Sequence, residues 1–260
     1  MNPTDLFSLS GRVALVTGGS RGIGKMIATG FLAAGAKRVY ISSRKADACD
    51  ATAEALRAFG DCVSLPGDVS TIDGARALAA EIARREPQLD ILVNNAGAAW
   101  GAPFDEFPES GWDKVVDLNM KAPFFLTQVL APQLRAAAQP GRPAKVINIA
   151  SIDGISVNPW ETYSYAASKA GLIHLTKRMS LRLAQDNIVM SAIAPGPFRS
   201  EMNREARDRA DEVARRVPVG RVGEDEDMAG AAVYLASRAG DYVVGETLVV
   251  DGGVTLTRGS

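Results

Sequence analysis

The feature that most constrains the fold is the regular alternation of short apolar runs with amphipathic stretches of helix length. Strands that alternate with helices join through right-handed crossovers into a mainly parallel sheet. The apolar runs are continuous, which is typical of strands buried on both faces. We therefore predict a Rossmann-like, doubly wound α/β fold with helices on both faces of the sheet. The predicted strands cover 13–16, 38–42, 62–65, 91–93, 145–149, 188–193 and 247–250, and the predicted helices cover 26–34, 46–59, 72–85, 112–137, 163–184, 201–216 and 225–235.

The domain organisation is predicted to be simple. The chain has 260 residues, and no linker rich in Pro, Gly or Ser divides it. A chain of this length suits one large α/β domain, so we expect residues 1–260 to form a single domain. The polar segment 197–217, rich in Arg and Glu, is expected to be mobile.

Composition excludes several classes of function. The net charge is -1 and the basic residues are scattered, which argues against nucleic acid or an anionic membrane as a partner. No apolar run is long enough to span a bilayer. Two cysteines without a CxxC pattern and a single histidine, His174, give no set of metal ligands. We expect His174 to be structural, no metal to be bound, and the protein to be cytoplasmic.

A glycine-rich turn joins the first strand to the first helix. Gly18, Gly22 and Gly24 enclose Ser20, Arg21 and Ile23, with a strand before them and a helical pattern after them. Glycines allow the backbone to approach a pyrophosphate, and the helix N-terminus offers free N–H groups and a positive dipole end. The alternative is a tight turn that needs glycine only for its φ angles. The context between strand and helix favours a dinucleotide site.

The end of the second strand indicates which dinucleotide is bound. An acidic residue there would bind the ribose of NAD, whereas arginine accommodates the 2′-phosphate of NADP. The chain has Ser43 and Arg44 at this point and Arg21 in the glycine turn, while Asp47 is expected in the first turn of the next helix. These residues predict a phosphate clamp for NADP(H). The alternative is that the arginines are ordinary solvated side chains.

Tyr165 and Lys169 lie four residues apart within a helical pattern. Positions i and i+4 share one face of a helix, so the phenol and the ammonium can meet in one site. A neighbouring cation lowers the pKa of a tyrosine, which suits an acid or base near neutral pH. The pair alone does not distinguish this role from an ordinary helix surface.

The motifs in their order resemble those of the short-chain dehydrogenase/reductase family over nearly the whole chain. Each motif is weak alone, but the ordered set is specific. The set comprises Thr17 to Gly24, Asp68-Val69, Asn94 to Gly97, Asn119, Ser151, Tyr165 with Lys169, Pro195-Gly196 and Asp251 to Gly253.

The resemblance implies a role for each of four catalytic residues. Tyr165 would donate a proton to a substrate carbonyl, and Ser151 would hold that carbonyl by a hydrogen bond. Lys169 would bind the nicotinamide ribose and lower the pKa of the tyrosine. Asn119 would organise a water that links Lys169 to solvent. Hydride transfer is the chemistry of the coenzyme, so the protein supplies orientation and the proton.

The resemblance also implies further coenzyme contacts. Asn94 is expected to brace the fourth strand instead, while Ser200 stands where the family usually has a threonine that contacts the carboxamide. Phe198 is bulkier than usual and is expected to shape the pocket. The implied contacts are Asp68 and Val69 at the adenine, Asn95, Ala96 and Gly97 along the cleft, and Pro195, Gly196, Phe198 and Ser200 near the nicotinamide.

Within the family, several stretches are similar to the β-ketoacyl reductases, including the subgroup associated with rhamnolipid producers. The resemblance implies an NADPH-dependent reductase of a 3-oxoacyl thioester or hydrophobic ketone, with 197–217 over the substrate, working as a homotetramer. Apolar residues expected near the site support an apolar pocket. An NAD(P)-dependent alcohol or polyol dehydrogenase is the alternative, followed by a non-catalytic NADP-binding sensor. The expected pocket residues are Trp100, Phe104, Trp160, Phe198 and Met202.

Overall fold

The strands form one seven-stranded parallel sheet in the order β3-β2-β1-β4-β5-β6-β7. The computed structural model describes residues 3–257, without the side chains of Pro3 and Arg204. The order reverses between β1 and β4, so the sheet is doubly wound as predicted. The strands are β1 (Val13–Thr17), β2 (Arg38–Ser42), β3 (Cys62–Ser64), β4 (Ile91–Asn94), β5 (Ala144–Ile149), β6 (Ile188–Pro195) and β7 (Thr247–Val250).

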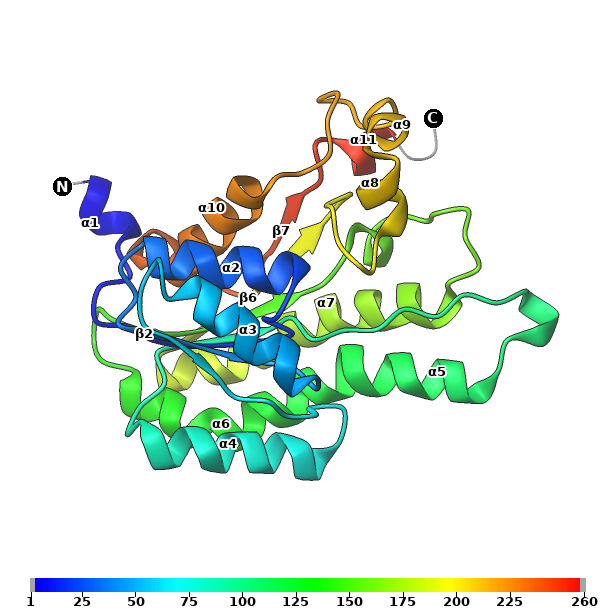
Figure 1. Ribbon diagram of the computed structural model, residues 1–260. Helices are drawn as coiled ribbons and strands as arrows, with labels where there is room; N and C mark the ends of the chain where they lie inside the picture. Colours follow the sequence, from blue (N-terminus) through cyan, green and yellow to red (C-terminus); the bar gives the residue numbers. More distant parts are fainter. Residues whose placement is uncertain (1–2, 258–260) are drawn as a thin grey trace.

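Two helical layers cover the sheet (Figure 1). One apolar core lies under α2 (Gly22–Ala33), α3 (Ala46–Leu56) and α10 (Asp225–Ala236). The other lies under α4 (Ile72–Arg85), α6 (Ala122–Ala137) and the last part of α7 (Tyr163–Leu183). Every residue of β1, β4, β5 and β6 is buried, as the continuous apolar runs predicted.

Four predicted helices differ from the structure, and the first of them, α2, begins at Gly22 and not at residue 26. The long helix begins earlier, as α5 (Glu109–Val116), and a π-helical turn, η2 (Asp117–Lys121), joins it to α6. Helix α3 ends at Leu56. The polar segment forms two short helices, α8 (Arg204–Asp208) and α9 (Ala210–Ala214), because Arg209 between them has φ of −132° and ψ of 46°, outside the helical region. Helix α4 has the predicted bounds.

Several short elements were not predicted. They are α1 (Pro3–Phe7) and α11 (Val254–Thr257), and the 3-10 turns η1 (Phe104–Glu106), η3 (Ile152–Gly154), η4 (Ala184–Asp186) and η5 (Arg238–Gly240). Such segments are too short for a periodic pattern to reveal. No helix within residues 3–257 combines the length and the apolar character needed to cross a membrane.

Candidate active site

The glycine turn lies at the carboxyl ends of β1 and β4, beside the point where the strand order reverses. Gly18 has φ of +65°, and a Cβ there would lie 2.7 Å from Nδ2 of Asn95. A Cβ on Gly24 would lie 2.3 Å from the carbonyl oxygen of Gly18. Only glycine fits at either position, so these two glycines set the close packing between the turn and helix α2.

Helix α2 begins in this turn with its first N–H groups free. Its N-cap residue, Arg21, forms no capping hydrogen bond through its side chain, and the first turn has no acidic residue. The N-terminus of such a helix binds anions through its N–H groups and its dipole. Gly22 has φ of +51°, and a Cβ there would lie 3.1 Å from Cβ of Ser200. The fold thus brings Ser200 to the glycine turn.

Arg21 and Arg44 follow neighbouring strands at the same edge of the sheet. Thr17 and Ser42, the last residues of β1 and β2, are in register, and the N–H of Gly19 donates to the carbonyl of Ser42 at 3.2 Å. Both arginine side chains are exposed. Neither forms an ion pair with any carboxylate of residues 3–257. Asp47 lies in the first turn of α3, as expected.

Asn95 and Ala96 are fixed by Thr17, a residue whose positioning role the sequence did not reveal. The buried Thr17 hydroxyl accepts hydrogen bonds from the N–H groups of Asn95 and Ala96 at 3.0 and 3.1 Å. The Asn95 amide donates to the carbonyl of Thr17 at 2.8 Å. Asn94 also has the expected bracing role, since its amide donates to Oδ1 of Asn148 at 2.8 Å and to Thr127 at 3.2 Å.

Asp68 and Val69 follow β3 at the same edge. The Asp68 carboxylate is exposed and accepts the N–H of Ser70 at 3.0 Å, while Val69 is buried. Both were expected at the adenine, and the structure places them at the carboxyl end of the sheet with the glycine turn.

Ser151 and Tyr165 face each other across the end of β5. Ser151 is the N-cap residue of η3, directly after the strand, and its side chain lies close enough to the phenol of Tyr165 to favour the phenolate. The side chain of Lys169, one turn further along α7, is buried and donates to the carbonyl of Ile149 at 2.7 Å. Its Nζ lies 5.7 Å from the centre of the Tyr165 ring.

The predicted lowering of the Tyr165 pKa is wrong for this set of side chains. Burial raises the pKa of Tyr165 to about 12, because it removes solvation from the phenolate, and the Ser151 side chain only partly opposes this. Burial also lowers the pKa of Lys169 to about 8. Lys169 forms no ion pair with a carboxylate of residues 3–257 that would oppose this effect of burial on its pKa, because its ammonium donates to the backbone carbonyl of Ile149.

Asn119 lies in the π-helical turn, and its amide is occupied by protein groups. Oδ1 accepts the N–H of Ala98 at 2.8 Å, and Nδ2 donates to the carbonyl of Ala98 at 2.9 Å and to Ser168 at 3.1 Å. The Ser168 hydroxyl donates in turn to the carbonyl of Tyr165 at 2.8 Å. Asn119 therefore ties the loop at Ala98 to the helix that carries Tyr165, and Ser168 is a positioning residue that the sequence did not reveal.

The segment after β6 contributes one contact that differs from expectation. The Phe198 ring is 2% exposed and belongs to the apolar core, where it packs so closely on Gly223 that a Cβ there would lie 2.5 Å from the ring. The expectation that this ring shapes the pocket is therefore wrong. Pro195 ends β6, and Gly196 packs against Asp251, since a Cβ on Gly196 would lie 2.6 Å from the Asp251 backbone.

The other predicted pocket residues are divided between the site and its surroundings. Met202 is 50% exposed and lies over Gly97, while Trp160 is 55% exposed. Trp100 packs on α5, with Nζ of Lys114 5.1 Å from its ring centre. Phe104 is exposed and meets the Tyr163 ring edge-on at 5.7 Å.

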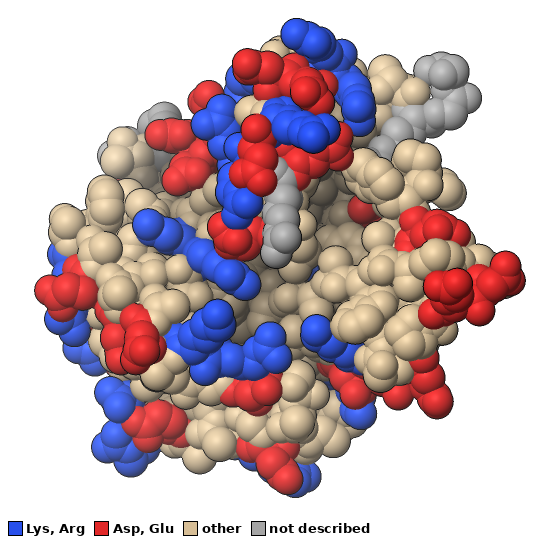
Figure 2. All heavy atoms as spheres, turned by 45° about the vertical axis from the view of Figure 1, so that its right-hand side comes forward, with Lys and Arg blue, Asp and Glu red and all other residues tan. Residues whose placement is uncertain are grey.

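The open face above the carboxyl ends of the strands is hollowed (Figure 2). Lys and Arg side chains lie along one side of the hollow, and a group of acidic and basic side chains projects over it at the top of the view. His174 is exposed on α7, so it does not pack in the core as a structural histidine would. Among residues 3–257, no three His, Cys, Asp or Glu side chains gather as metal ligands.

Fold, motifs and comparisons together show that the chain belongs to the short-chain dehydrogenase/reductase family. A family model described as enoyl-(acyl carrier protein) reductase matches residues 18–255. The predicted fold and the predicted class of enzyme, an oxidoreductase of this family, are confirmed.

Individual relatives match along their whole length. The rhamnolipids biosynthesis 3-oxoacyl-[acyl-carrier-protein] reductase of Pseudomonas aeruginosa is 48% identical over 255 residues, which cover 96% of this chain and 98% of the relative. The gluconate 5-dehydrogenase of Gluconobacter oxydans is 37% identical, with 99% and 100% covered. A solved Pseudomonas aeruginosa RhlG/NADP active-site complex has a TM-score of 0.93 and 46% identity, with 98% and 100% covered. The predicted coenzyme, NADP(H), agrees with this complex.

Proposed function

We propose that this protein is an NADPH-dependent carbonyl reductase in which Tyr165 donates the proton. The observation that carries the proposal is that the side chain of Ser151 lies beside the phenol of Tyr165, next to the glycine turn and the buried Lys169. Two hydroxyl donors in one place can hold and protonate a carbonyl oxygen. NADPH, when bound, supplies the hydride.

The residues of the carboxyl edge fit the coenzyme. The uncapped start of α2 suits its pyrophosphate, and the unpaired Arg21 and Arg44 suit its 2′-phosphate. Asp68, Val69, Asn95, Ala96 and Gly97 would line its remaining length. Pro195, Gly196 and Ser200 would lie at the nicotinamide end.

Burial raises the pKa of Tyr165 to about 12, so its hydroxyl stays protonated at neutral pH. In reduction this hydroxyl would give its proton to the carbonyl oxygen. Oxidation of an alcohol would need the phenolate, which burial disfavours.

The proton lost by Tyr165 has a route back through Lys169 and Asn119. The Asn119 side chain is occupied, so we infer that its backbone carbonyl holds the relay water. Pro123, four residues further on, has no N–H to donate to that carbonyl. Lys169, with a pKa of about 8, can exchange a proton with such a water near neutral pH.

The surroundings of the site favour an apolar substrate. The loop 155–161, which follows Ser151, exposes Ile155, Val157 and Trp160, and Met202 faces the site from the other side over Gly97. Exposed apolar side chains that gather around a hollow are typical of a ligand site. A 3-oxoacyl thioester or a hydrophobic ketone suits this surface, and the 48% identical relative bears the name of a 3-oxoacyl reductase.

A second candidate, a polyol or sugar-acid dehydrogenase, is favoured by one observation. The gluconate 5-dehydrogenase relative matches 99% of the chain at 37% identity. The two candidates differ in the polarity of the substrate, and a sugar acid gains nothing from exposed apolar side chains.

The substrate series that separates the candidates is acetoacetyl, 3-oxooctanoyl and 3-oxodecanoyl thioesters against 5-ketogluconate, with NADPH. We expect kcat/KM to rise with chain length and to be lowest for 5-ketogluconate. Trp160→Ala should lower kcat/KM for the long-chain thioesters about tenfold. Phe59→Ala, which changes an equally exposed aromatic residue outside the site, should leave kcat/KM unaltered. Preference for 5-ketogluconate would establish the second candidate instead.

We further infer a homotetramer, a cytoplasmic location and a moving segment. The packed pair α5 and α7 offers exposed side chains, such as Trp112 and Leu181, for subunit contact, and light scattering measures the mass of the assembly.

Two buried free thiols suit a reducing compartment. The segment 197–217 has a small apolar core apart from the main cores, and hydrogen exchange with and without NADP+ tests whether it closes.

A further inference from the structure

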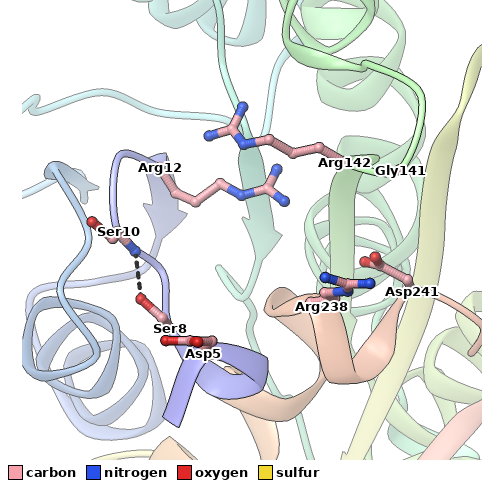
Figure 3. Close-up of a pocket in the computed structure, with 8 residues that line it drawn as sticks. All are labelled: Asp5, Ser8, Ser10, Arg12, Gly141, Arg142, Arg238 and Asp241. Atoms are coloured by element: carbon pink, nitrogen blue, oxygen red, sulfur yellow. Dashed lines mark hydrogen bonds between the residues drawn. The ribbon is translucent and has the colours of Figure 1, made fainter. Parts of the chain in front are cut away.

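A separate cavity opens at the amino-terminal edge of the sheet (Figure 3). Its volume is about 310 Å³. Each residue of a strand advances about 3.3 Å, so β1 separates Arg12 from the glycine turn by roughly 20 Å. The residues that line the cavity are Asp5, Ser8, Ser10, Arg12, Gly141, Arg142, Arg238 and Asp241.

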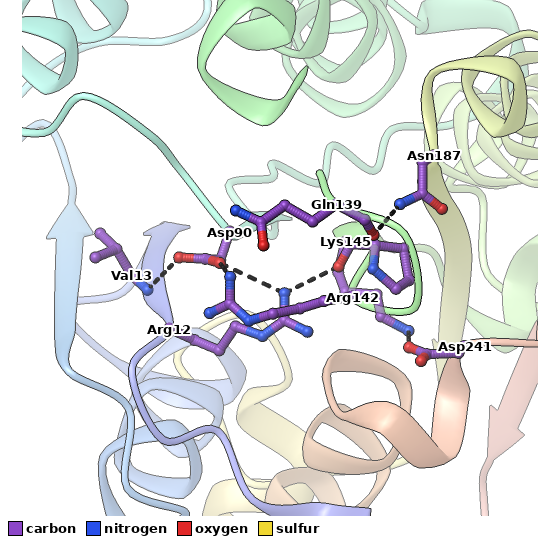
Figure 4. A network of polar contacts seen from close by, with 9 residues as sticks. Arg12, Val13, Asp90, Gln139, Arg142, Lys145, Asn187 and Asp241 are labelled. Carbon is purple, nitrogen blue, oxygen red and sulfur yellow. Dashed lines mark hydrogen bonds and ion pairs between the residues drawn. The ribbon is translucent and has the colours of Figure 1, made fainter. Parts of the chain in front are cut away.

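One buried carboxylate holds two of the cavity's guanidinium groups (Figure 4). Asp90 is fully buried and lies 2.9 Å from Nη1 of Arg142 and 3.4 Å from Nη1 of Arg12. Its other oxygen accepts the N–H of Val13 at 2.9 Å. Nη1 of Arg12 also donates to the carbonyl of Pro143 at 2.9 Å. Each arginine uses one nitrogen in these contacts and has five N–H donors in all, so donors are left for a ligand in the cavity.

The third guanidinium group, that of Arg238, is exposed and forms no ion pair with any carboxylate of residues 3–257. The neighbouring Asp241 is already paired with the buried Lys145, at 2.7 Å. Asp5 is the remaining carboxylate of the lining. The cavity therefore contains a cation that the protein does not neutralise.

The arginines also oppose one another. The pKa of Arg12 is lowered by burial first and by the charge of Arg142 next, and the pull of Asp90 does not offset these two effects. A bound anion would reverse both effects, because it replaces lost solvation and shields the two like charges. The site is thus arranged for a negative group of its own.

We propose that this cavity binds a phosphate-type oxyanion, either inorganic phosphate or a phosphate monoester, through Arg12, Arg142 and Arg238. Arginine forks match the oxygens of phosphate and bind them in pairs. The three arginines come from the start of β1, the turn before β5 and η5, so one anion would join three distant parts of the chain. Asp5 and Asp241, on the cavity wall, disfavour more highly charged polyphosphates.

The direct test is isothermal titration of inorganic phosphate into the protein saturated with NADP+, at ionic strength held constant with chloride. Saturation keeps phosphate out of the coenzyme site. Arg12 and Arg142 are unsuitable for substitution, because their loss would leave Asp90 unbalanced and could unfold the protein. Arg238→Gln removes a side chain with no such partner. The matched control is Arg76→Gln, on the exposed surface of α4.

We expect phosphate to bind the wild-type protein and Arg76→Gln equally, and Arg238→Gln at least tenfold more weakly. Phosphate should also raise the Tm of the wild-type protein more than that of Arg238→Gln. No binding to the coenzyme-saturated protein, or equal binding to Arg238→Gln, overturns the proposal. A parallel titration with glycerol 3-phosphate identifies the source of the anion: tighter binding than inorganic phosphate indicates a monoester, and weaker binding indicates the free ion.

Discussion

At the amino edge of the sheet, Asp90 lies between Arg12 and Arg142, whereas at the carboxyl edge Arg21 and Arg44 have no carboxylate partner within residues 3–257. The two edges are built from the same strands, so the difference does not come from the fold. The ion pairs of Asp90 hold together the loops that carry Arg12 and Arg142, and Arg238 is the one arginine of that cavity without an ion pair within residues 3–257. Unpaired arginines beside a free helix N-terminus leave their charge for a ligand.

The two buried lysines show the same difference. Burial lowers the pKa of Lys145 and of Lys169. Asp241, 2.7 Å away, raises the pKa of Lys145 again in part, whereas Lys169 forms no ion pair within residues 3–257 and donates to the carbonyl of Ile149. A buried charge without a counter-charge costs stability, and such groups are concentrated at functional sites.

The largest effect is expected at Tyr165. Tyr165→Phe removes the proton donor and leaves the apolar ring, so kcat should fall by about a thousandfold or more while NADPH affinity stays within about twofold. Tyr163→Phe is the matched control, because this neighbouring hydroxyl donates to Glu161 at 3.0 Å. Steady-state kinetics and NADPH titration of both variants measure the difference, and similar losses in both would refute the assignment.

The next effect tests the amino edge. Asp90→Asn leaves Arg12 and Arg142 without their shared negative charge, so the free energy of unfolding should fall by about 3 kcal/mol. Urea unfolding measures it. Asp73→Asn, in an exposed pair on α4, should cost less than about 0.5 kcal/mol. If Asp90→Asn cost no more than the surface variant, the paired cluster would not stabilise the edge.

A smaller effect is expected for coenzyme choice. Arg44→Asp exchanges a phosphate partner for a carboxylate, so the ratio of kcat/KM for NADPH over NADH should fall by about tenfold to a hundredfold. Lys37→Asp makes the same charge change at the opposite end of β2 and should leave the ratio unaltered. An unchanged ratio in Arg44→Asp would remove Arg44 from the clamp.

The smallest effect is a change in stability, and it concerns Lys169. Its pKa of about 8 lies below the ordinary value of 10.5, so the folded protein binds fewer protons than the unfolded chain between these values, and its stability rises with pH through that window. Lys169→Met should therefore be about 1 kcal/mol more stable than wild type at pH 7, an advantage that shrinks by pH 10. Urea unfolding at both pH values checks this, and a variant less stable at pH 7 would contradict it.

The same pKa gives a prediction for the rate. If the Lys169 cation assists the reaction, kcat/KM for reduction should decline as pH rises through about 8, because the ammonium loses its proton there. The Tyr165 hydroxyl, with a pKa of about 12, would not titrate in this range. A profile that stays flat to pH 9.5 would assign no role to the charge of Lys169.

Sequence patterns predicted the sheet and most helix bounds, because each buried strand is a continuous apolar run. The glycine turn was predictable for a similar reason, since Gly18, Gly22 and Gly24 follow a strand pattern directly and precede a helical pattern. These features depend on residues near one another in the chain. The family motifs then located Ser151, Tyr165 and Lys169.

Features set by distant residues were not predictable. The burial of Phe198 depends on Gly223, and the positioning hydroxyls of Thr17 and Ser168 act on partners far along the chain. The pKa values also depend on burial, which the Tyr165 and Lys169 spacing does not report. The arginine cavity joins residues 12, 142 and 238, which no sequence motif connects.

The central claim is that the carboxyl edge uses NADPH to reduce a carbonyl. The most direct measurement follows the nicotinamide absorbance with wild-type protein, NADPH and a long-chain 3-oxoacyl thioester, and identifies the product by mass spectrometry. We predict stoichiometric formation of the 3-hydroxyacyl thioester, with NADH at least tenfold less effective. Consumption of NADH at an equal rate, or no 3-hydroxyacyl product while NADPH binds tightly, would contradict the account.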